Sequence, residues 1–313
     1  MFVHPLPRRD APPLGQAAAA FLERFREAPT TRRTYAETLD VLAAAADGPD
    51  LPVDAAFTPE AAAAAMARWE AAAPSTWNKH LAALRSFAAY GLRQEWLAAD
   101  PTRFLERRRA PRRGDRSVPA ARLEALLADT RHELRERVLW RMLYETAARA
   151  EEVLTLDVAD LDPAMRRARI HAKGGAVEYV HWATPTARLL PRLLAGRTSG
   201  PVFLADRRSP AAGSRARALA DVDPATGRGR LSYPRAEYLF KQASKRHDPH
   251  GDGWTLHRLR HSALTHLAEA GRSAAELQAK SRHQHLATLG KYVRLGEETA
   301  AAITAEHDPH RRR

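Results

Sequence analysis

Residues 255–292 read TLHRLRHSALTHLAEAGRSAAELQAKSRHQHLATLGKY, and this stretch says more about the fold than any other part of the 313-residue chain. Its first part predicts an amphipathic helix, because leucine and alanine recur there at helical spacing. Gly271 ends that helix. Ser273 and Glu276 form a capping box that starts another one. The stretch therefore predicts two consecutive helices joined by a short turn.

Four side chains capable of chemistry lie along these two helices. His257 and Arg260 are three residues apart and therefore share one helical face. His283 comes at the end of the second helix, and Tyr292 follows nine residues later. Taken alone, each of these residues is more often a solvated or core side chain than a functional one. The four residues together, with their fixed spacings, instead predict that they belong to one functional site.

Further upstream, the sequence predicts a mixed helical and β-sheet region. A long helix is expected over about 132–148, and two β-rich runs, 168–172 and 177–182, flank a Lys-Gly-Gly turn at 173–175. Residues 205–231 are rich in Arg, Gly, Pro and Ser and predict a long loop or a mobile insertion. Helices resume after this segment.

The first hundred residues predict an all-helical unit. Helices are expected over 17–28, over 31–46, from the Thr58-Pro59 start, and over 76–92. The last of these has one apolar stripe, made of Trp77, Leu81, Leu84, Phe87 and Ala88. Off that stripe lie the candidate DNA-binding residues Thr76, Asn78, Lys79 and Arg85. The alternative for them is an ordinary solvated helix face.

Charge points to a phosphate-rich partner. The chain has 50 Lys+Arg against 37 Asp+Glu, a net charge of +13, which is typical of proteins that bind nucleic acid or an anionic membrane surface. Residues 103–116 carry a net charge of +5, and we interpret 104–117 as a basic linker between two domains. Its candidate DNA-binding residues are Arg108, Arg109, Arg112 and Arg113. A solvated tether is the alternative, but such dense charge repels itself unless phosphates neutralise it.

Several kinds of chemistry are excluded by composition. The chain has no cysteine, which excludes disulfides, cysteine-ligated zinc and thiol catalysis. It has neither a GxGxxG nor a GxxxxGK[ST] motif. His257 and His261 are four apart, the spacing of two zinc ligands, but no matching carboxylate accompanies them. We expect no metal and no cofactor.

No apolar run reaches 18 residues, so we expect no membrane partner and a cytoplasmic, nucleoid-associated protein.

In the stretch 255–292 and in the segments before it, the sequence resembles the tyrosine recombinase (phage integrase) family, and within it the Xer-like recombinases. The late box of that family has the form H-x-x-R, then 23 residues to a second His or Trp, then nine to Tyr, and residues 257–292 keep both spacings. The early box, T-G-L-R-x-x-E, is matched by TAARAEE at 146–152, which contains Arg149. The hairpin lysine is matched by Lys173. The resemblance covers nearly the whole chain except 205–231.

The resemblance implies a mainly α fold with a small β-sheet in the catalytic domain. It implies a helical core-binding domain at 1–103, the linker at 104–117 and a mixed α/β catalytic domain with a C-terminal tail at 118–313. The two domains would form a clamp around double-stranded DNA. The family also implies a homo-tetramer in the synapse, or pairing with a second recombinase.

The resemblance also implies a catalytic set of Arg149, Lys173, His257, Arg260, His283 and Tyr292. In this set Tyr292 attacks a DNA phosphodiester and forms a 3′-phosphotyrosyl intermediate. Arginines stabilise the charge on the phosphate, because their guanidinium groups are planar and always charged. Lys173 is one of only 6 lysines among the 50 basic residues, and it can release a proton where arginine cannot. Glu152 has a supporting role.

Two other functions stay open from the sequence alone. One is a sequence-specific DNA-binding protein of the same fold with weakened strand exchange, because Ala147 and Arg282 occupy positions where the family has glycine. The other is a type IB-like topoisomerase, which shares the chemistry. The helical first domain favours recombination, since it offers a second surface for reading DNA.

Overall fold

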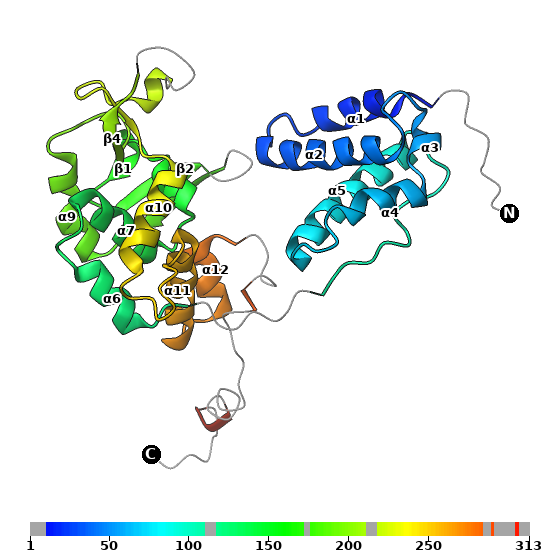
Figure 1. Ribbon diagram of the computed structural model, residues 1–313. Coiled ribbons are helices and arrows are strands. Elements are labelled where there is room, and N and C mark those ends of the chain that lie inside the picture. Colours follow the sequence, from blue (N-terminus) through cyan, green and yellow to red (C-terminus); the bar gives the residue numbers. More distant parts are fainter. Residues whose placement is uncertain are drawn as a thin grey trace. The chain divides into compact units, whose positions relative to one another are not determined.

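The computed structural model describes residues 11–109, 117–171, 176–210, 218–283, 289–290 and 304–306. The chain divides into two compact units, Met1–Arg113 and Gly114–Arg313 (Figure 1). The division falls inside the basic segment at 104–117. The expectation of a mainly helical protein with small antiparallel sheets is confirmed.

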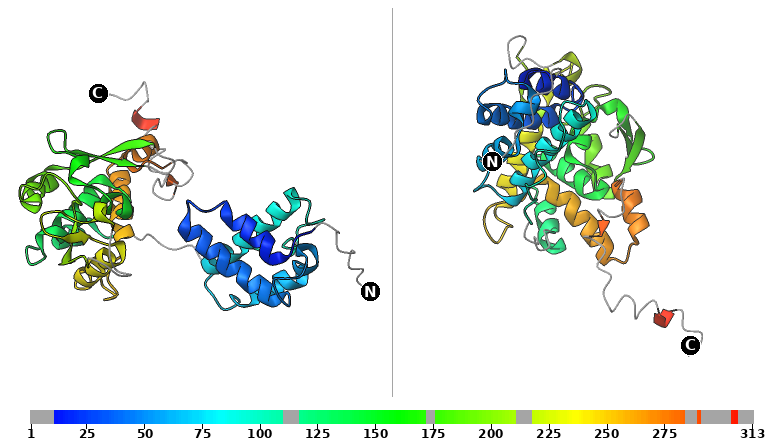
Figure 2. Two further views of the ribbon diagram at one scale, coloured as in Figure 1. Left: turned by 90° about the horizontal axis from the view of Figure 1, so that it is seen from above. Right: turned by 90° about the vertical axis from the view of Figure 1, so that its right-hand side faces the viewer.

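Unit 1 is built from helices, which lie side by side in Figures 1 and 2. They are α1 (Leu14–Glu23), α2 (Pro29–Ala45), α3 (Val53–Ala56), α4 (Pro59–Ala67) and α5 (Pro74–Arg93). Local signals set several of their starts. The Thr58 hydroxyl accepts a hydrogen bond from the Ala61 amide, and proline occupies the first turn of α2, α4 and α5.

The core of unit 1 forms where α5 packs against α1, α2 and α4. The apolar stripe of α5 is buried along its whole length, as the spacing predicted. Aromatic side chains fill much of the space, and Phe21 contacts both Phe87 and Tyr35 through ring pairs. Burying large aromatic rings supplies much of the stabilisation of so small a core.

His80 of α5 is a polar side chain inside this core. Its Nδ1 is 2.7 Å from the Thr38 hydroxyl, and its ring stacks on Trp69 at a centroid separation of 3.8 Å. Burial lowers the pKa of His80 below 6.5, and the charge of Lys79 lowers it further. The unfolded chain therefore takes up this proton more readily, so stability present above pH 6.5 is lost as the pH falls below it.

We expect the midpoint temperature or denaturant concentration for unfolding of the full chain to decrease when the pH is lowered from about 7.5 to about 5.5. The decrease should be smaller in His80→Phe, because phenylalanine takes up no proton. Thermal or denaturant unfolding at several pH values measures this. His250→Gln, which changes an exposed histidine, is the matched control and should follow the parent. Equal pH dependence in the parent and His80→Phe would contradict the prediction.

In the residues that the structure describes, unit 2 combines helices with two small antiparallel sheets. Its α-helices are α6 (Ala120–Ala128), α7 (Leu134–Thr146), α8 (Ala150–Leu154), α9 (Thr184–Leu194), α10 (Tyr233–Ser244), α11 (Leu256–Glu269) and α12 (Ala274–Ser281). Two 3-10 helices, η1 (Val158–Asp160) and η2 (Leu219–Asp221), accompany them. Its strands are β1 (Leu161–Asp162), β2 (Arg167–His171), β3 (Val177–His181), β4 (Leu204–Arg208) and β5 (Arg228–Arg230). The capping box of Ser273 and Glu276 starts α12, as predicted.

β2 and β3 form the expected hairpin, with Arg167 opposite His181 and His171 opposite Val177. β1 pairs with the other edge of β2. The connection between β2 and β3, residues 172–175, lies outside the described residues.

The expectation of a long loop over 205–231 is wrong for residues 205–208 and 228–230, which are strands. β4 and β5 pair there as a second sheet. The Ser209 amide donates to the Gly227 carbonyl at 2.8 Å, and Arg228 Nε donates to the Ala205 carbonyl at 2.6 Å. Composition indicated turns, but the arginine side chains bind backbone carbonyls and so order part of the segment.

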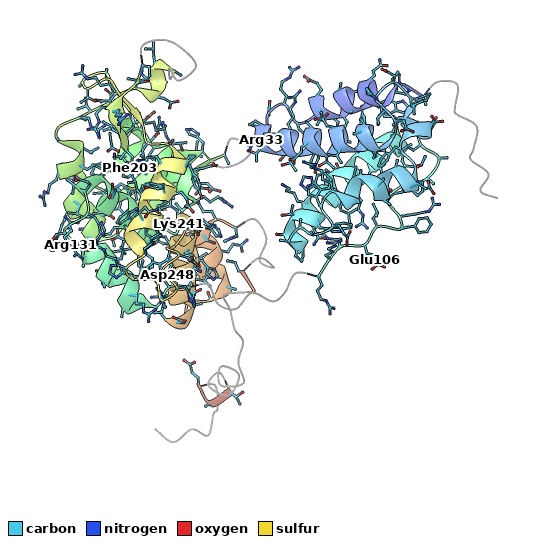
Figure 3. All side chains as sticks on the ribbon, viewed as in Figure 1. Arg33, Glu106, Arg131, Phe203, Lys241 and Asp248 are labelled. Atoms are coloured by element: carbon cyan, nitrogen blue, oxygen red, sulfur yellow. The ribbon has the colours of Figure 1, made fainter. Side chains whose placement is uncertain are left out.

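The main core of unit 2 lies between α7, α9, α10 and the first sheet. Trp140, Phe203, Phe240 and Trp254 are its large, fully buried side chains. Figure 3 shows Phe203 inside the body of the unit and Arg131 at its edge. Among the helices that the structure describes, none is long and apolar enough to cross a membrane.

Candidate active site

Two helices of unit 2 that reach into the predicted boxes, α7 and α12, are each followed by a residue with a left-handed backbone conformation. α7 ends at Thr146 and is followed by Ala147, with φ of 52°, and α12 ends at Ser281 and is followed by Arg282, with φ of 57°. Positive φ favours glycine, because a Cβ atom crowds the following carbonyl oxygen. These are the two positions where the sequence departs from the glycines of the family pattern. Both turns keep the glycine-like conformation without the glycine.

Arg260 of α11 joins these two turns. Its side chain is buried, with the residue only 4% exposed. Nη1 donates to the Ala147 carbonyl at 2.6 Å, and Nη2 donates to the Ser281 carbonyl at 2.7 Å. One guanidinium thus holds backbone segments that lie 113 residues and 21 residues away in the chain. One of these carbonyls belongs to the left-handed residue Ala147, and the other belongs to Ser281, which directly precedes the left-handed residue Arg282.

A small apolar cluster supports this arrangement. It contains Ala147, Ala263, Leu264, Leu277 and Leu289, all buried. The cluster packs the turn after α7 against one side of α11 and against α12. Arg260 therefore lies on a helix whose neighbouring elements are fixed by packing as well as by hydrogen bonds.

Arg149 lies two residues after the first turn, at the N-cap of α8. Its backbone amide donates to Glu152 Oε2 and its Nη1 donates to Glu152 Oε1, both at 2.8 Å. About half of the Arg149 side chain is exposed, whereas that of Glu152 is nearly buried. Burial alone would raise the pKa of Glu152, but the Arg149 amide and the nearby Arg282 charge outweigh it and lower this pKa. Glu152 is thus an ionised carboxylate that orients Arg149.

His283 lies directly after the second turn. Its Nδ1 is 2.5 Å from the Ser281 hydroxyl, and both ring nitrogens are 3.4 Å from Arg260 Nη2. Gln278 Nε2 donates to the His283 carbonyl at 2.9 Å, which fixes the backbone there. His257 is exposed in the first turn of α11, one helical turn before Arg260. The described part of the site therefore gathers α8, α11 and the end of α12.

Two of the predicted catalytic residues, Lys173 and Tyr292, lie outside the described residues, as do Arg112 and Arg113. The structure places Arg260 against His283, and it links both to Arg149 indirectly, through the Ala147 turn and through the pair of Glu152 with Arg282. In the part of the chain that it describes, no three histidine or acidic side chains gather in a way that could hold a metal ion.

Sequence reasoning missed the contacts of Arg282. Its guanidinium hydrogen-bonds through Nη2 to Glu152 Oε2, and its Nε is 3.1 Å from Glu178 Oε2 on β3. The side chain is only 8% exposed. The sequence marked Arg282 as a bulky cation in place of glycine, but no local signal indicated its partners.

The candidate DNA-binding residues of α5 have contacts within unit 1. Asn78 exchanges two 2.8 Å hydrogen bonds with the backbone of Arg108, and Arg85 Nη2 donates to the Leu105 carbonyl at 2.6 Å. The Arg108 guanidinium lies over the Trp77 ring and pairs with Glu70. The start of the basic segment is therefore bound along α5, a contact that sequence reasoning did not foresee.

The remaining candidates of this group are differently placed. Lys79 and Arg109 are exposed, and Thr76 is partly exposed. DNA contacts by any member of the group stay predictions.

Comparison with known proteins identifies the family. Residues 117–299 match the family described as the phage integrase family. The tyrosine recombinase XerC of Mycobacterium sp. (strain JLS) is 33% identical over 309 residues, which cover 92% of this chain and 94% of that protein. The tyrosine recombinase XerD of Ralstonia nicotianae is 28% identical over 250 residues, which cover 78% of this chain and 76% of that protein.

Solved structures share the fold. The Tn1549 transposon integrase in complex with a circular intermediate DNA has a TM-score of 0.67 at 16% identity, covering 95% of this chain and 100% of that one. A lambda integrase tetramer bound to a Holliday junction has a TM-score of 0.66 at 14% identity, covering 91% and 78%. Because the family match spans more than half of the chain and a 33% identical relative is covered almost end to end, the chain belongs to the phage integrase family of tyrosine recombinases, which are site-specific recombination enzymes.

Proposed function

We propose that this chain cuts and rejoins double-stranded DNA at a specific site through a 3′-phosphotyrosyl intermediate, with Tyr292 as the nucleophile. The observation that carries the proposal is the position of Arg260, whose buried guanidinium joins the turn before Arg149 to the turn before His283. This arrangement gathers three members of the predicted catalytic set from distant parts of the sequence. Burying a charged guanidinium removes it from water, which is unfavourable unless fixed partners bind it.

The chemistry follows from these side chains. The Tyr292 oxygen attacks phosphorus and the 5′-oxygen of the next nucleotide leaves, so one P–O bond forms as another breaks. Negative charge grows on the non-bridging oxygens, and Arg149, Arg260 and His283 offer it fixed donors. A phenol has a pKa near 10, so only about one in a thousand is ionised at pH 7. His257 is assigned to accept the Tyr292 proton, because imidazole titrates near neutral pH.

The reaction conserves the bond energy in the phosphotyrosyl link, so it needs no ATP. Attack by the 5′-hydroxyl of a second strand reverses the step and exchanges strands.

Lys173 is assigned to protonate the leaving 5′-oxygen. We expect Lys173→Ala to slow cleavage of an ordinary phosphodiester by about 100-fold to 10,000-fold, the usual contribution of a general acid. Replacing the bridging 5′-oxygen by sulfur should restore most of the rate, because a thiolate leaves without a proton. Single-turnover cleavage of the two substrates measures this. Equal defects on both would remove Lys173 from this role.

The proposal includes an assembly of four copies on two DNA sites, or of this chain with a second recombinase. The lambda integrase tetramer on a Holliday junction supports it by shared fold. Each subunit would clamp the duplex between its two units, and the segment after Tyr292 would dock on a neighbouring copy. The proposal also includes a location in the cytoplasm at the nucleoid. The net charge of +13 supports binding to the phosphate backbone.

Covalent trapping tests the proposed function. Genomic fragments retained by the protein first supply candidate sites, and each is then prepared as a nicked duplex so that the cleaved end diffuses away. Incubation in EDTA without ATP should give a protein–DNA adduct on a denaturing gel. Retention of DNA without any adduct, across all selected sites, would favour a binding protein of the same fold instead. The preserved left-handed turns at Ala147 and Arg282 argue against that alternative.

A further inference from the structure

The side chain of Arg282 joins two carboxylates from different elements. Its Nη2 binds Glu152 of α8, and its Nε is 3.1 Å from Glu178 of β3. Glu152 in turn holds Arg149 through two hydrogen bonds. The four side chains form one continuous series of alternating charges, Arg149, Glu152, Arg282 and Glu178. It crosses from α8 through the end of α12 to the β2–β3 hairpin.

The central pair of this series differs from an exposed surface ion pair, whereas the outer members Arg149 and Glu178 are 53% and 37% exposed. Arg282 and Glu152 are 8% and 11% exposed, so their attraction is weakly screened by solvent. An isolated charge at such depth would be strongly unfavourable, which makes each partner depend on the other. A third contact lies beside it, since Lys280 Nζ donates to the His181 carbonyl at the end of β3 at 3.2 Å. The end of α12 and the residue after it therefore contact β3 through one hydrogen bond, from Lys280, and one ion pair, from Arg282.

The backbone at this position would be easier to form with glycine. Arg282 has φ of 57°, in the region where a side chain strains the chain. Glycine would make the same turn but would leave Glu152 and Glu178 without this partner. The arginine therefore adds a connection that the turn itself does not require.

We propose that Arg282 is a positioning residue for strand cleavage, which by binding Glu152 and Glu178 together fixes Arg149 and the turn end of the β2–β3 hairpin relative to the His283 turn. This inference rests on the proposed function. It assigns Arg282 no contact with DNA, because its guanidinium is directed to the two carboxylates. Its effect is expected on the rate of the chemical step and not on DNA affinity.

Three variants test the connection. Arg282→Gly removes both ties while keeping a residue suited to the turn, Glu178→Gln removes only the tie to β3, and the third variant combines the two. Glu124→Gln is the matched control, because it breaks an Arg–Glu pair between α6 and Arg141 of α7, away from the site. Each protein is studied as the full chain.

The first readout is single-turnover cleavage of a nicked duplex carrying a selected site. We expect Arg282→Gly to lower the rate constant about 10-fold to 100-fold, the effect of a misplacement near 1 Å. Glu178→Gln should show a smaller loss, and the double variant should be no slower than Arg282→Gly, since one tie cannot be lost twice. The reaction amplitude and DNA affinity should match those of Glu124→Gln. A variant that merely unfolds would lower the amplitude and leave the rate constant unchanged.

The second readout uses the 5′-thio substrate. Lys173 belongs to the connection between β2 and β3, so a misplaced hairpin should mainly impair protonation of the leaving group. Glu178→Gln should then regain most of its rate on sulfur. Equal loss on the oxygen and sulfur substrates would overturn the link between Arg282 and the hairpin.

The third readout is independent of DNA. Denaturant unfolding of the parent, both single variants and the double variant forms a cycle that measures the coupling of Arg282 and Glu178. If the two substitutions change the free energy of unfolding additively, the inference is overturned whatever the DNA experiments give. Coupling in a parent chain that forms no adduct would overturn the proposed function, and with it the role in cleavage. Coupling together with the expected rate pattern supports both.

Discussion

Tyr292→Phe should abolish the covalent protein–DNA adduct while leaving DNA binding at the level of the parent. The change removes one oxygen atom, which is the atom assigned to attack phosphorus. A phenol is almost entirely neutral at pH 7, so the substitution changes no charge that DNA would sense. Denaturing gels measure the adduct and filter retention measures the affinity, both in EDTA.

Tyr238→Phe is the matched control for this experiment. Tyr238 is an exposed tyrosine on α10, and its replacement removes the same hydroxyl from unit 2. We expect this variant to form the adduct at the rate of the parent. An adduct that persists in Tyr292→Phe would show that another residue is the nucleophile and would end the assignment.

Arg260→Ala should produce the second large effect, on both catalysis and stability. Cleavage should slow by about 100-fold to 1,000-fold, as when one fixed donor to a transition-state oxyanion is lost. The same change leaves the buried carbonyls of Ala147 and Ser281 without their donor. Each such group costs about 1–3 kcal/mol, so the free energy of unfolding should fall by several kcal/mol. Denaturant unfolding and single-turnover cleavage measure the two effects.

Arg230→Ala separates the two effects. Arg230 also donates from one side chain to two backbone carbonyls, those of Leu154 and Leu156, and it pairs with Asp157 and Asp221. Its loss should destabilise unit 2 comparably but leave the cleavage rate constant of the folded protein unchanged. If Arg230→Ala slowed cleavage as much as Arg260→Ala, the catalytic assignment of Arg260 would be wrong.

The sequence contained enough information to predict much of the site. The spacings of His257, Arg260, His283 and Tyr292 depend on adjacent helix starts and stops, which are local properties of the chain. Ala147 and Arg282 lie at the positions where the family pattern has glycine, and the structure shows that both turns keep a left-handed conformation even though the residues differ. The match of residues 117–299 to the phage integrase family and the 33% identical relative confirm the family that these spacings indicated.

Other contacts were beyond sequence reasoning. Nothing local to Glu178 indicates that it pairs with a residue on α12, and nothing local to Asn78 indicates that it binds the backbone of Arg108. The partial order of 205–231 depends on arginine side chains that reach carbonyls of other strands. Such contacts join residues far apart in the chain, and no periodicity or capping rule extends over that distance.

By itself the sequence determined the starts of several helices, which faces are apolar and which residue types recur at the spacings of a tyrosine recombinase. These features follow from hydrogen bonds and side-chain periodicity within one or two helical turns. Only the tertiary structure decided that one buried guanidinium, Arg260, joins the Arg149 and His283 turns, and that Arg282 holds two carboxylates. The physical reason is that burial gives long-range ion pairs and hydrogen bonds their strength, and burial exists only once the two ends of the chain segment have packed together.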